Sequence, residues 1–318
     1  MLPATKLLPQ GGTWSLADSV IDIGKILEGS IPLGKIGQII VGIKPYQTGK
    51  GVPKQTKEIG EGKVFTSDRK VDDTYIRCVI GKDFHRYVYV NEPSMYLSYG
   101  KWLAEPRETA PFFKEKIIIR QTSDSLIAHL DSNKWINLNN VYNVAVEDEN
   151  YSNLYVLSLL NSKLMNCIYQ FISQEKGKTF AEVKKVYLEK LPIKPVRNDT
   201  RKLFEIIAQK IIQLSLDLNK RKQNFYKLLK AEFGLSRLPK KMDSFFKMNY
   251  EEFIKALGVK LSMLQKAELI DIFENNKKIL SALFEEIQSL KFETDKQICT
   301  LYELTNEERA VVLETSTS

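Results

Sequence analysis

The sequence has few cysteines and no long apolar run, and both absences restrict what it can encode. Cys78, Cys167 and Cys299 lie far apart and form no C-x-x-C pair, so we expect buried, reduced thiols rather than disulfides or a metal site. No stretch reaches 18 consecutive apolar residues, and the N-terminus lacks a charged head followed by an apolar run. Neither a membrane span nor a signal peptide is indicated, and we expect a cytoplasmic protein.

Motifs for chemistry are also missing. The glycine-rich and lysine-rich stretch 44–70 contains no GxxxxGK[ST], and no GxGxxG lies there between a strand and a helix. A nuclease of the PD-(D/E)xK kind needs acidic residues around a lysine to hold a metal. Residues 58–63 and 131–134 offer only loose combinations of that kind. We therefore predict no catalytic residue, no metal site and no cofactor.

What the chain does contain is the composition of a globular, basic protein. With 318 residues, 43% apolar and 27% charged, two domains are a better expectation than one, and each can bury a core. The formal net charge is +8, which favours an acidic polymer as partner without proving one.

The first two thirds of the chain have the pattern of a sheet domain. Residues 1–30 read as a leader with one entry helix over 16–27, and residues 33–43 as a first strand. Short β-rich runs then follow, separated by turns: 75–80, 87–90, 116–120, 126–130 and 141–146. Runs of this spacing predict a mostly antiparallel sheet. One helix is expected over 151–171 and an exit strand near 187–193.

After Val196 the pattern becomes helical. Helices are expected over 203–234, 250–258 and 266–292, with a short final pair over 292–314. Residues 197–247 hold 13 basic against 5 acidic residues, so this stretch could lie along DNA or simply face solvent. We predict an α+β fold with boundaries at 1–30, 31–196 and 197–318.

The stretch 81–121 carries the main signal for function. It reads GKDFHRYVYVNEPSMYLSYGKWLAEPRETAPFFKEKIIIRQ and places aromatic and basic residues between β-forming runs. Arginine forks match paired acceptors on guanine, glutamine matches adenine, and lysine supplies point charge for phosphate. His85 lies in this stretch and His129 beyond it. Structural or DNA-facing roles are favoured for both over general-base catalysis.

The order of these pieces resembles the TaqI-like C-terminal specificity domain, the target recognition part of adenine-N6 DNA methyltransferases and of type IIG restriction-modification enzymes. The segments that carry the resemblance are GKDFHRY (81–87), YGKWL (99–103) with Pro106-Arg107, KIIIR (116–120), the LLNS motif (159–162) and LEKLPI (188–193). The helical tail is similar in plan to the spacers of type I specificity subunits.

The resemblance implies a module that recognises double-stranded DNA in sequence-specific fashion beside an adenine-N6 methyltransferase domain or subunit. Methylation in that family needs a cofactor-binding glycine motif and an Asn/Asp-Pro-Pro-aromatic motif that holds the flipped base. Neither occurs in the sequence, so the chain is not expected to be an enzyme by itself.

Candidate DNA-contacting residues come from the basic loop, from the central stretch and from a lysine-rich turn. For the loop, the simpler alternative is a mobile, solvated segment; the sharper hypothesis is groove contact, to which Tyr46 and Gln55 would also contribute. The full set of candidates is Lys44, Gln47, Lys50, Lys54, Lys101, Trp102, Arg107, Arg120, Gln121, Lys176 and Lys178.

Two other classes stay open. The chain could be a helical protein-interaction scaffold or specificity subunit that docks a methyltransferase or nuclease partner, or a fragment with cryptic nuclease activity. Failure to bind any duplex would favour the scaffold, and metal-dependent cleavage would reveal the nuclease.

Overall fold

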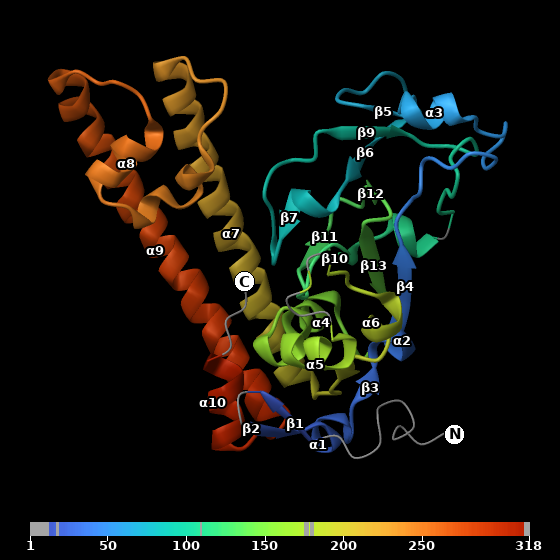
Figure 1. The fold of residues 1–318 in the computed structure, drawn as a ribbon. Helices are drawn as coiled ribbons and strands as arrows, with labels where there is room; N and C mark the ends of the chain where they lie inside the picture. Colours follow the sequence, from blue (N-terminus) through green and yellow to red (C-terminus); the bar gives the residue numbers. More distant parts are fainter. Residues whose placement is uncertain (1–12, 17–18, 109, 175–177, 179–180, 315–318) are drawn as a thin grey trace. The chain divides into compact units, whose positions relative to one another are not determined.

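The computed structural model describes residues 13–16, 19–108, 110–174, 178 and 181–314 (Figure 1). The chain forms two compact units. The sheet unit comprises residues up to Gln209 together with Phe292 onward, and the helical unit comprises Lys210–Lys291. Two long helices, α7 (Asn198–Phe233) and α9 (Met263–Leu301), contribute residues to both units. The boundaries expected from the sequence stay a prediction.

A four-stranded antiparallel sheet forms the centre of the sheet unit. Its order is β11-β10-β13-β4, with β4 spanning Gly37–Val41, β10 Lys116–Arg120, β11 Ala128–Asp131 and β13 Val141–Val146. The isoleucines of β10 are all fully buried. This explains why β10 reads as a continuous apolar run rather than an alternating one.

A second four-stranded sheet has the order β12-β6-β9-β5 and one parallel pair, β12 with β6. Three two-stranded ribbons complete the strands. Within the described residues most pairings are antiparallel, and the predicted α+β class is confirmed. The remaining strands are β1 (Thr13–Leu16), β2 (Ser19–Asp22), β3 (Ile31–Pro32), β5 (Thr66–Ser67), β6 (Tyr75–Val79), β7 (Phe84–His85), β8 (Val88–Tyr89), β9 (Met95–Ser98), β12 (Ile136–Asn137) and β14 (Pro192–Ile193).

Two segments that we expected to be extended, 33–43 and 187–193, begin in short helices, and one expected helix, 16–27, begins as a strand. Ser19–Asp22 is a strand that pairs with β1, and the entry helix starts only at Ile23. The first predicted strand begins at Gly37, since the four residues before it form a helical turn. The short helices of the sheet unit are α1 (Ile23–Leu27), α2 (Leu33–Ile36), α3 (Lys57–Glu61), α6 (Lys185–Leu188), η2 (Gly81–Asp83) and η3 (Ala110–Phe113).

The helix expected over 151–171 is two helices, α4 (Asn153–Leu160) and α5 (Lys163–Ser173). The Ser162 hydroxyl accepts a bond from the Met165 amide and caps α5, which starts a new helix at that point. Asn161 is buried, and its side chain accepts a bond from Ala128 N (3.1 Å) and donates one to Ala128 O (3.0 Å). The LLNS motif therefore attaches the helices to β11.

The C-terminal segment belongs to the sheet unit. Tyr302 is 1% exposed and donates its hydroxyl hydrogen to Pro192 O (2.7 Å). Helix α10 (Asn306–Glu314) contributes Glu308, whose carboxylate accepts bonds from Asp22 N (3.0 Å) and Thr305 N (2.7 Å). The end of the described chain is thus held against its beginning.

Aromatic side chains form the core of the helical unit. Phe225, Phe245, Phe253 and Phe273 are each at most 3% exposed, and their rings lie 4.5 to 6.3 Å apart in pairs. They join α7 and α9 to η4 (Lys240–Lys247) and α8 (Tyr250–Leu257). Gly258 ends α8 at φ +72°, a left-handed conformation that favours glycine.

Candidate nucleic-acid interface

The basic loop after β4 is folded around one buried side chain. Gln55 is 3% exposed, and its amide makes three hydrogen bonds. Its oxygen accepts from Gln47 N (2.9 Å), while its nitrogen donates to Pro45 O (2.8 Å) and to Trp102 O (2.7 Å). The groove-contact hypothesis included Gln55, but a side chain buried in this way cannot reach a DNA groove. Gln55 instead determines the shape of the loop.

Backbone hydrogen bonds join this loop to the segment 101–105. Val52 N donates to Lys101 O (2.9 Å), and Ala104 N donates to Pro45 O (3.1 Å). Lys44 and Glu105 exchange both backbone bonds, at 2.9 and 3.3 Å. The structure thus brings together six of the eleven candidates, Lys44, Gln47, Lys50, Lys54, Lys101 and Trp102, although more than 40 positions separate the two segments. We call residues 44–55 with 101–105 the basic loop surface.

The charge of this surface has one sign at its exposed positions. Lys50, Lys54 and Lys101 are exposed, and across the described part of the chain no ion pair involves any of them. The Lys44 ammonium donates to the Gln47 amide oxygen (2.7 Å). Unpaired lysines on a fixed loop are suited to phosphate contact, because each is a point charge that needs no exact orientation.

Aromatic side chains support the surface from beneath. The Trp102 indole N–H donates to Ser98 O (3.0 Å). Tyr46 stacks on Phe65 at 5.5 Å, and its hydroxyl accepts from Phe65 N (2.9 Å). Trp102 and Tyr46 are not fully exposed and are already packed, so they are better placed to hold the loop than to stack on bases.

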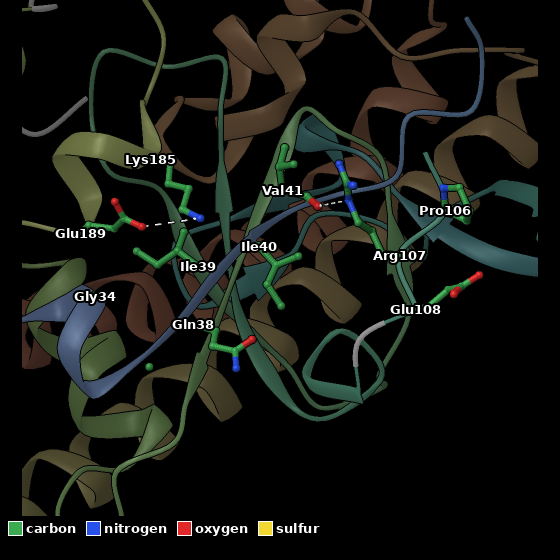
Figure 2. A pocket seen from close by; sticks show the side chains of 11 residues that line it. Gly34, Gln38, Ile39, Ile40, Val41, Pro106, Arg107, Glu108, Lys185 and Glu189 are labelled. Carbon is green, nitrogen blue, oxygen red and sulfur yellow. Dashed lines mark hydrogen bonds and ion pairs between the residues drawn. The ribbon is translucent and has the colours of Figure 1, made fainter. Parts of the chain in front are cut away.

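Arg107 faces the backbone. Its Nε donates to Val41 O (2.8 Å), and its Nη2 pairs with Glu105 Oε2 (3.0 Å). These bonds fix the segment 105–107 against the end of β4 (Figure 2). In this arrangement two of the guanidinium nitrogens are already engaged.

An open cavity of about 590 Å³ lies along β4 beside Arg107. Figure 2 shows Lys185 of α6 and Glu189, which directly follows α6, on its other side, joined by an ion pair of 3.5 Å. Its two bases and two acids offset one another, and no histidine, cysteine or serine is among the described residues that line it. Its described lining therefore offers no serine or cysteine nucleophile beside a histidine base.

Arg120 and Gln121 lie at the end of β10, where Arg120 meets the β7–β8 ribbon. The Arg120 guanidinium lies over the Phe84 ring at 5.8 Å and donates to Phe84 O. Burial lowers the pKa of Arg120, with Asp83 opposing the shift. Gln121 is held through its backbone, which donates to Asn140 O (3.0 Å) and accepts from Val183 N (2.7 Å). Both side chains are half-buried.

Only part of the lysine-rich turn lies within the described residues. Lys178 is exposed, whereas Lys176 lies outside them. Arg107 is joined to the basic loop surface by its bond to Glu105. No described hydrogen bond joins Arg120 or Gln121 to that surface.

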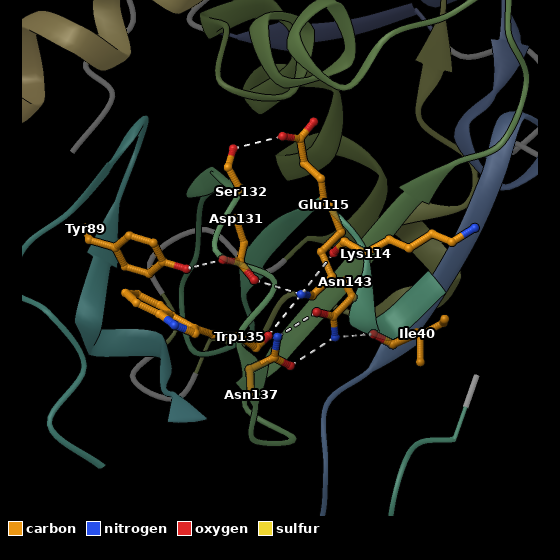
Figure 3. Close-up of polar contacts among 10 residues, drawn as sticks. Ile40, Tyr89, Lys114, Glu115, Asp131, Ser132, Trp135, Asn137 and Asn143 are labelled. Atoms are coloured by element: carbon orange, nitrogen blue, oxygen red, sulfur yellow. Dashed lines mark hydrogen bonds and ion pairs between the residues drawn. The ribbon is translucent and has the colours of Figure 1, made fainter. Parts of the chain in front are cut away.

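Two buried polar pairs hold the sheets beneath the surface (Figure 3). Lys116 and Asp131 are fully buried and 2.7 Å apart, and the Tyr89 hydroxyl donates to the other Asp131 oxygen at 3.0 Å. Asn137 and Asn143 exchange amide bonds of 2.6 and 3.0 Å. Asn143 also donates to Ile40 O (3.1 Å), which holds β4 just before the loop. Losing one member of a buried ion pair typically costs about 3–5 kcal/mol.

The two histidines differ in burial. His85 is exposed, whereas His129 is 4% exposed among Phe84 and Tyr89, and burial lowers its pKa to about 4. All three cysteines are buried thiols. Over the described ranges, no group of three His, Cys, Asp or Glu side chains is arranged to hold a metal ion. None of the described helices is both long and apolar enough to cross a membrane.

The pairing of sheets, the LLNS attachment and the β7–β8 ribbon all involve residues between 77 and 193, and this range matches the sequence model of a known family. Residues 77–193 match the model of the TaqI-like C-terminal specificity domain. The resemblance drawn from the sequence is thereby confirmed. Lys101, Trp102, Arg107, Arg120 and Gln121 lie inside the specificity domain, while the loop 44–55 precedes it and is bonded to it.

The other comparisons are less informative. Residues 197–298 match a domain of unknown function (DUF8810). Among solved structures, the type IIL restriction-modification enzyme MmeI in complex with DNA is similar over 81% of this chain and 36% of that chain, at 13% identity and a TM-score of 0.34. At this TM-score the likeness carries no argument. No curated protein matches the chain.

Proposed function

We propose that this chain is the sequence-specific DNA recognition part of a restriction-modification system. The specificity domain family supports the general role. The observation that supports the position of the DNA site is the basic loop surface. In it, a buried glutamine holds the loop with its unpaired lysines against the specificity domain. Phosphate contacts would set the register on the duplex, and side chains at the groove would read bases.

Within this proposal the residues divide by their surroundings. Lys50, Lys54 and Lys101 would contact phosphates, and exposed Gln47 is the base reader that the loop offers, once its oxygen exchanges the bond from Lys44. Arg107, Arg120, Gln121, Lys176 and Lys178 stay predictions. For Arg107 and Arg120, a contact with DNA would require the present bonds to Val41 and Phe84 to be exchanged.

Catalysis would come from a partner. The sequence holds neither the cofactor motif nor the base-holding motif of an adenine-N6 methyltransferase. An adenine-N6 methyltransferase domain or subunit, as in type IIG enzymes, would act on the site that this chain recognises. Recognition of DNA inside the cell would also place the chain in the cytoplasm, which stays a prediction.

The test is selection of bound duplexes from a random-sequence pool by the full chain, at low and at moderate salt. We expect an enriched motif that survives the higher salt, because nonspecific binding falls steeply as counterions compete. The triple variant Lys50→Gln, Lys54→Gln, Lys101→Gln should weaken binding to the selected duplex by at least about tenfold. Lys35→Gln, Lys70→Gln, Lys114→Gln, with the same change of net charge elsewhere on the sheet unit, should weaken it far less.

Each other result has a definite meaning. Equal losses in the two triple variants would reject the basic loop surface as the site. Absence of any duplex binding at low salt would reject DNA recognition and favour the protein-interaction scaffold. Cleavage of DNA by the chain with a divalent metal would reject the proposal that catalysis belongs to a partner.

A further inference from the structure

The helical unit has a strongly basic stretch of its own. Residues 220–247 contain nine lysines and arginines against two acids, Glu232 and Asp243. The remainder of the unit after this stretch, 248–291, contains six basic and seven acidic residues. The positive charge is therefore concentrated in the C-terminal half of α7 and in the segment that leads into η4, rather than spread over the unit.

The aromatic core holds the two parts of this stretch together. Tyr226 of α7 donates its hydroxyl hydrogen to Met242 O of η4 (2.5 Å), and the Phe225 and Phe245 rings lie 4.7 Å apart. Lys227 directly follows Tyr226, and Lys241 directly precedes Met242. The lysines on α7 and those on η4 thus extend from a single packed base.

Six of the nine basic side chains are exposed without an ion pair among the residues that the structure describes: Lys220, Lys227, Lys230, Arg237, Lys240 and Lys241. The other three have partners within the unit. Arg221 pairs with Asp217 (2.9 Å), Lys222 lies over Tyr226 (5.9 Å), and Lys247 lies over Phe284 (4.2 Å). The fold uses these three and leaves the six available.

We infer that these six residues, which we call the α7–η4 basic patch, are a second DNA contact that binds phosphates without reading sequence. Lysines dominate the patch, and lysine suits phosphate as a point charge. The aromatic rings beneath it are buried, so the patch offers no stacking platform for single-stranded bases. A duplex backbone is the polyanion that these features fit. The inference depends on the proposed function only for the identity of that polyanion.

The experiment compares two quadruple variants of the full chain. The patch variant is Lys227→Gln, Lys230→Gln, Lys240→Gln, Lys241→Gln. The control, Lys255→Gln, Lys260→Gln, Lys266→Gln, Lys278→Gln, removes the same charge from exposed positions elsewhere in the unit. Because all eight side chains are exposed, both variants should unfold at the temperature of the unmodified chain, and circular dichroism checks this.

The measurement is the affinity for a random-sequence duplex as a function of salt. Each phosphate contact contributes about 0.9 to the slope of log K against log salt. The patch variant should lose roughly 2 to 4 from that slope and bind about tenfold or more weakly at low salt. The control variant should keep the slope. An unchanged slope in the patch variant, or an equal loss in the control, would overturn the inference.

The outcomes separate this inference from the proposed function. Suppose that the unmodified chain selects a motif but the patch variant keeps its full salt slope. Sequence recognition would then be supported, whereas the inference would be rejected, and the patch would be assigned to some other acidic partner. A lower slope in the patch variant of a chain that selects no motif would support the patch and reject sequence-specific recognition.

Discussion

Gln55 determines the shape of the basic loop surface although its own side chain is buried. Its amide bonds three backbone groups, Gln47 N, Pro45 O and Trp102 O, and of these only Pro45 O has a second described partner, Ala104 N. A buried backbone group that loses its partner costs about 1–3 kcal/mol. The loop is therefore kept in one conformation by a residue that contributes no charge.

Replacing Gln55 by leucine tests this role. Gln55→Leu should lower the free energy of unfolding by about 2–4 kcal/mol, because Gln47 N and Trp102 O lose their hydrogen bonds, while Pro45 O keeps the bond from Ala104 N. It should also weaken binding to the selected duplex, although the lysines remain. Gln47→Leu, at an exposed position, should change stability by at most about 0.5 kcal/mol. Thermal or urea unfolding of both variants gives the comparison, and a stable Gln55→Leu would refute the role.

His129 makes the stability of the sheet unit depend on pH. Burial lowers its pKa from 6.5 to about 4, so the folded state disfavours the protonated form. Stability from the neutral histidine is complete above pH 6.5 and is lost as pH falls toward 4, where the unfolded chain binds a proton that the folded chain does not. The total loss should be about 3 kcal/mol at most.

His129→Phe should remove that part of the pH dependence, because a phenyl ring can lie between Phe84 and Tyr89 without titrating. His85→Gln is the matched control, since His85 is exposed. Urea unfolding across the acidic range down to about pH 4 measures the difference. If His129→Phe keeps the same slope with pH as His85→Gln, the buried imidazole is not its source.

The residue scale is also where sequence reasoning was weakest. Gln55 and Gln47 look alike in the sequence, yet one is buried and the other exposed. Asn137 and Asn143 carried no signal at all, because their pairing depends on two strands from different sheets. Side-chain roles of this kind are decided by tertiary contacts that no local pattern encodes.

At the scale of elements the sequence predicted more. The runs at 116–120 and 141–146 became β10 and β13 with the same bounds, because continuous or alternating apolar residues suffice to define a strand. The break between α4 and α5 was missed. Apolar periodicity continues across it, and only the capping hydroxyl of Ser162 marks a new helix.

The two glycines of the basic loop provide a test at this scale. Gly49 and Gly51 both have φ near +80°, so alanine is strained at either. A Cβ on Gly49 would meet nothing, whereas a Cβ on Gly51 would collide with the Trp102 carbonyl oxygen that Gln55 binds. Gly49→Ala should cost about 1 kcal/mol from strain alone.

Gly51→Ala should cost clearly more than Gly49→Ala and should also weaken duplex binding, because the loop must separate from the segment 101–105. Unfolding curves and affinities for the two variants, measured side by side, check this expectation. Equal effects would mean that the close approach of the two segments is unimportant for the basic loop surface.

At the scale of the whole molecule, the C-terminal segment packs into the same unit as the N-terminal segment. Phe292 onward belongs to the sheet unit. A periodic pattern shows that a segment is helical but not which core receives it, so the sequence could not assign the last helices. Tyr302 and Glu308, which bond to Pro192 and Asp22, supply that information only in three dimensions.

The packing of the C-terminal segment into the sheet unit leads to a prediction about truncation. A chain that ends at Lys291 would lose the buried Tyr302 ring and the bonds of Tyr302 and Glu308, so the specificity domain itself should unfold at a lower temperature even though its own residues 77–193 are intact. A chain that ends at Glu314 should unfold like the full chain.

Because the shorter chain could fail to fold, Tyr302→Phe serves as a milder variant: it keeps the buried ring and removes its hydroxyl bond to Pro192, which should cost about 1 kcal/mol. Scanning calorimetry of the three proteins decides the matter, since a chain ending at Lys291 with an undiminished transition would show that the sheet unit does not need its C-terminal segment.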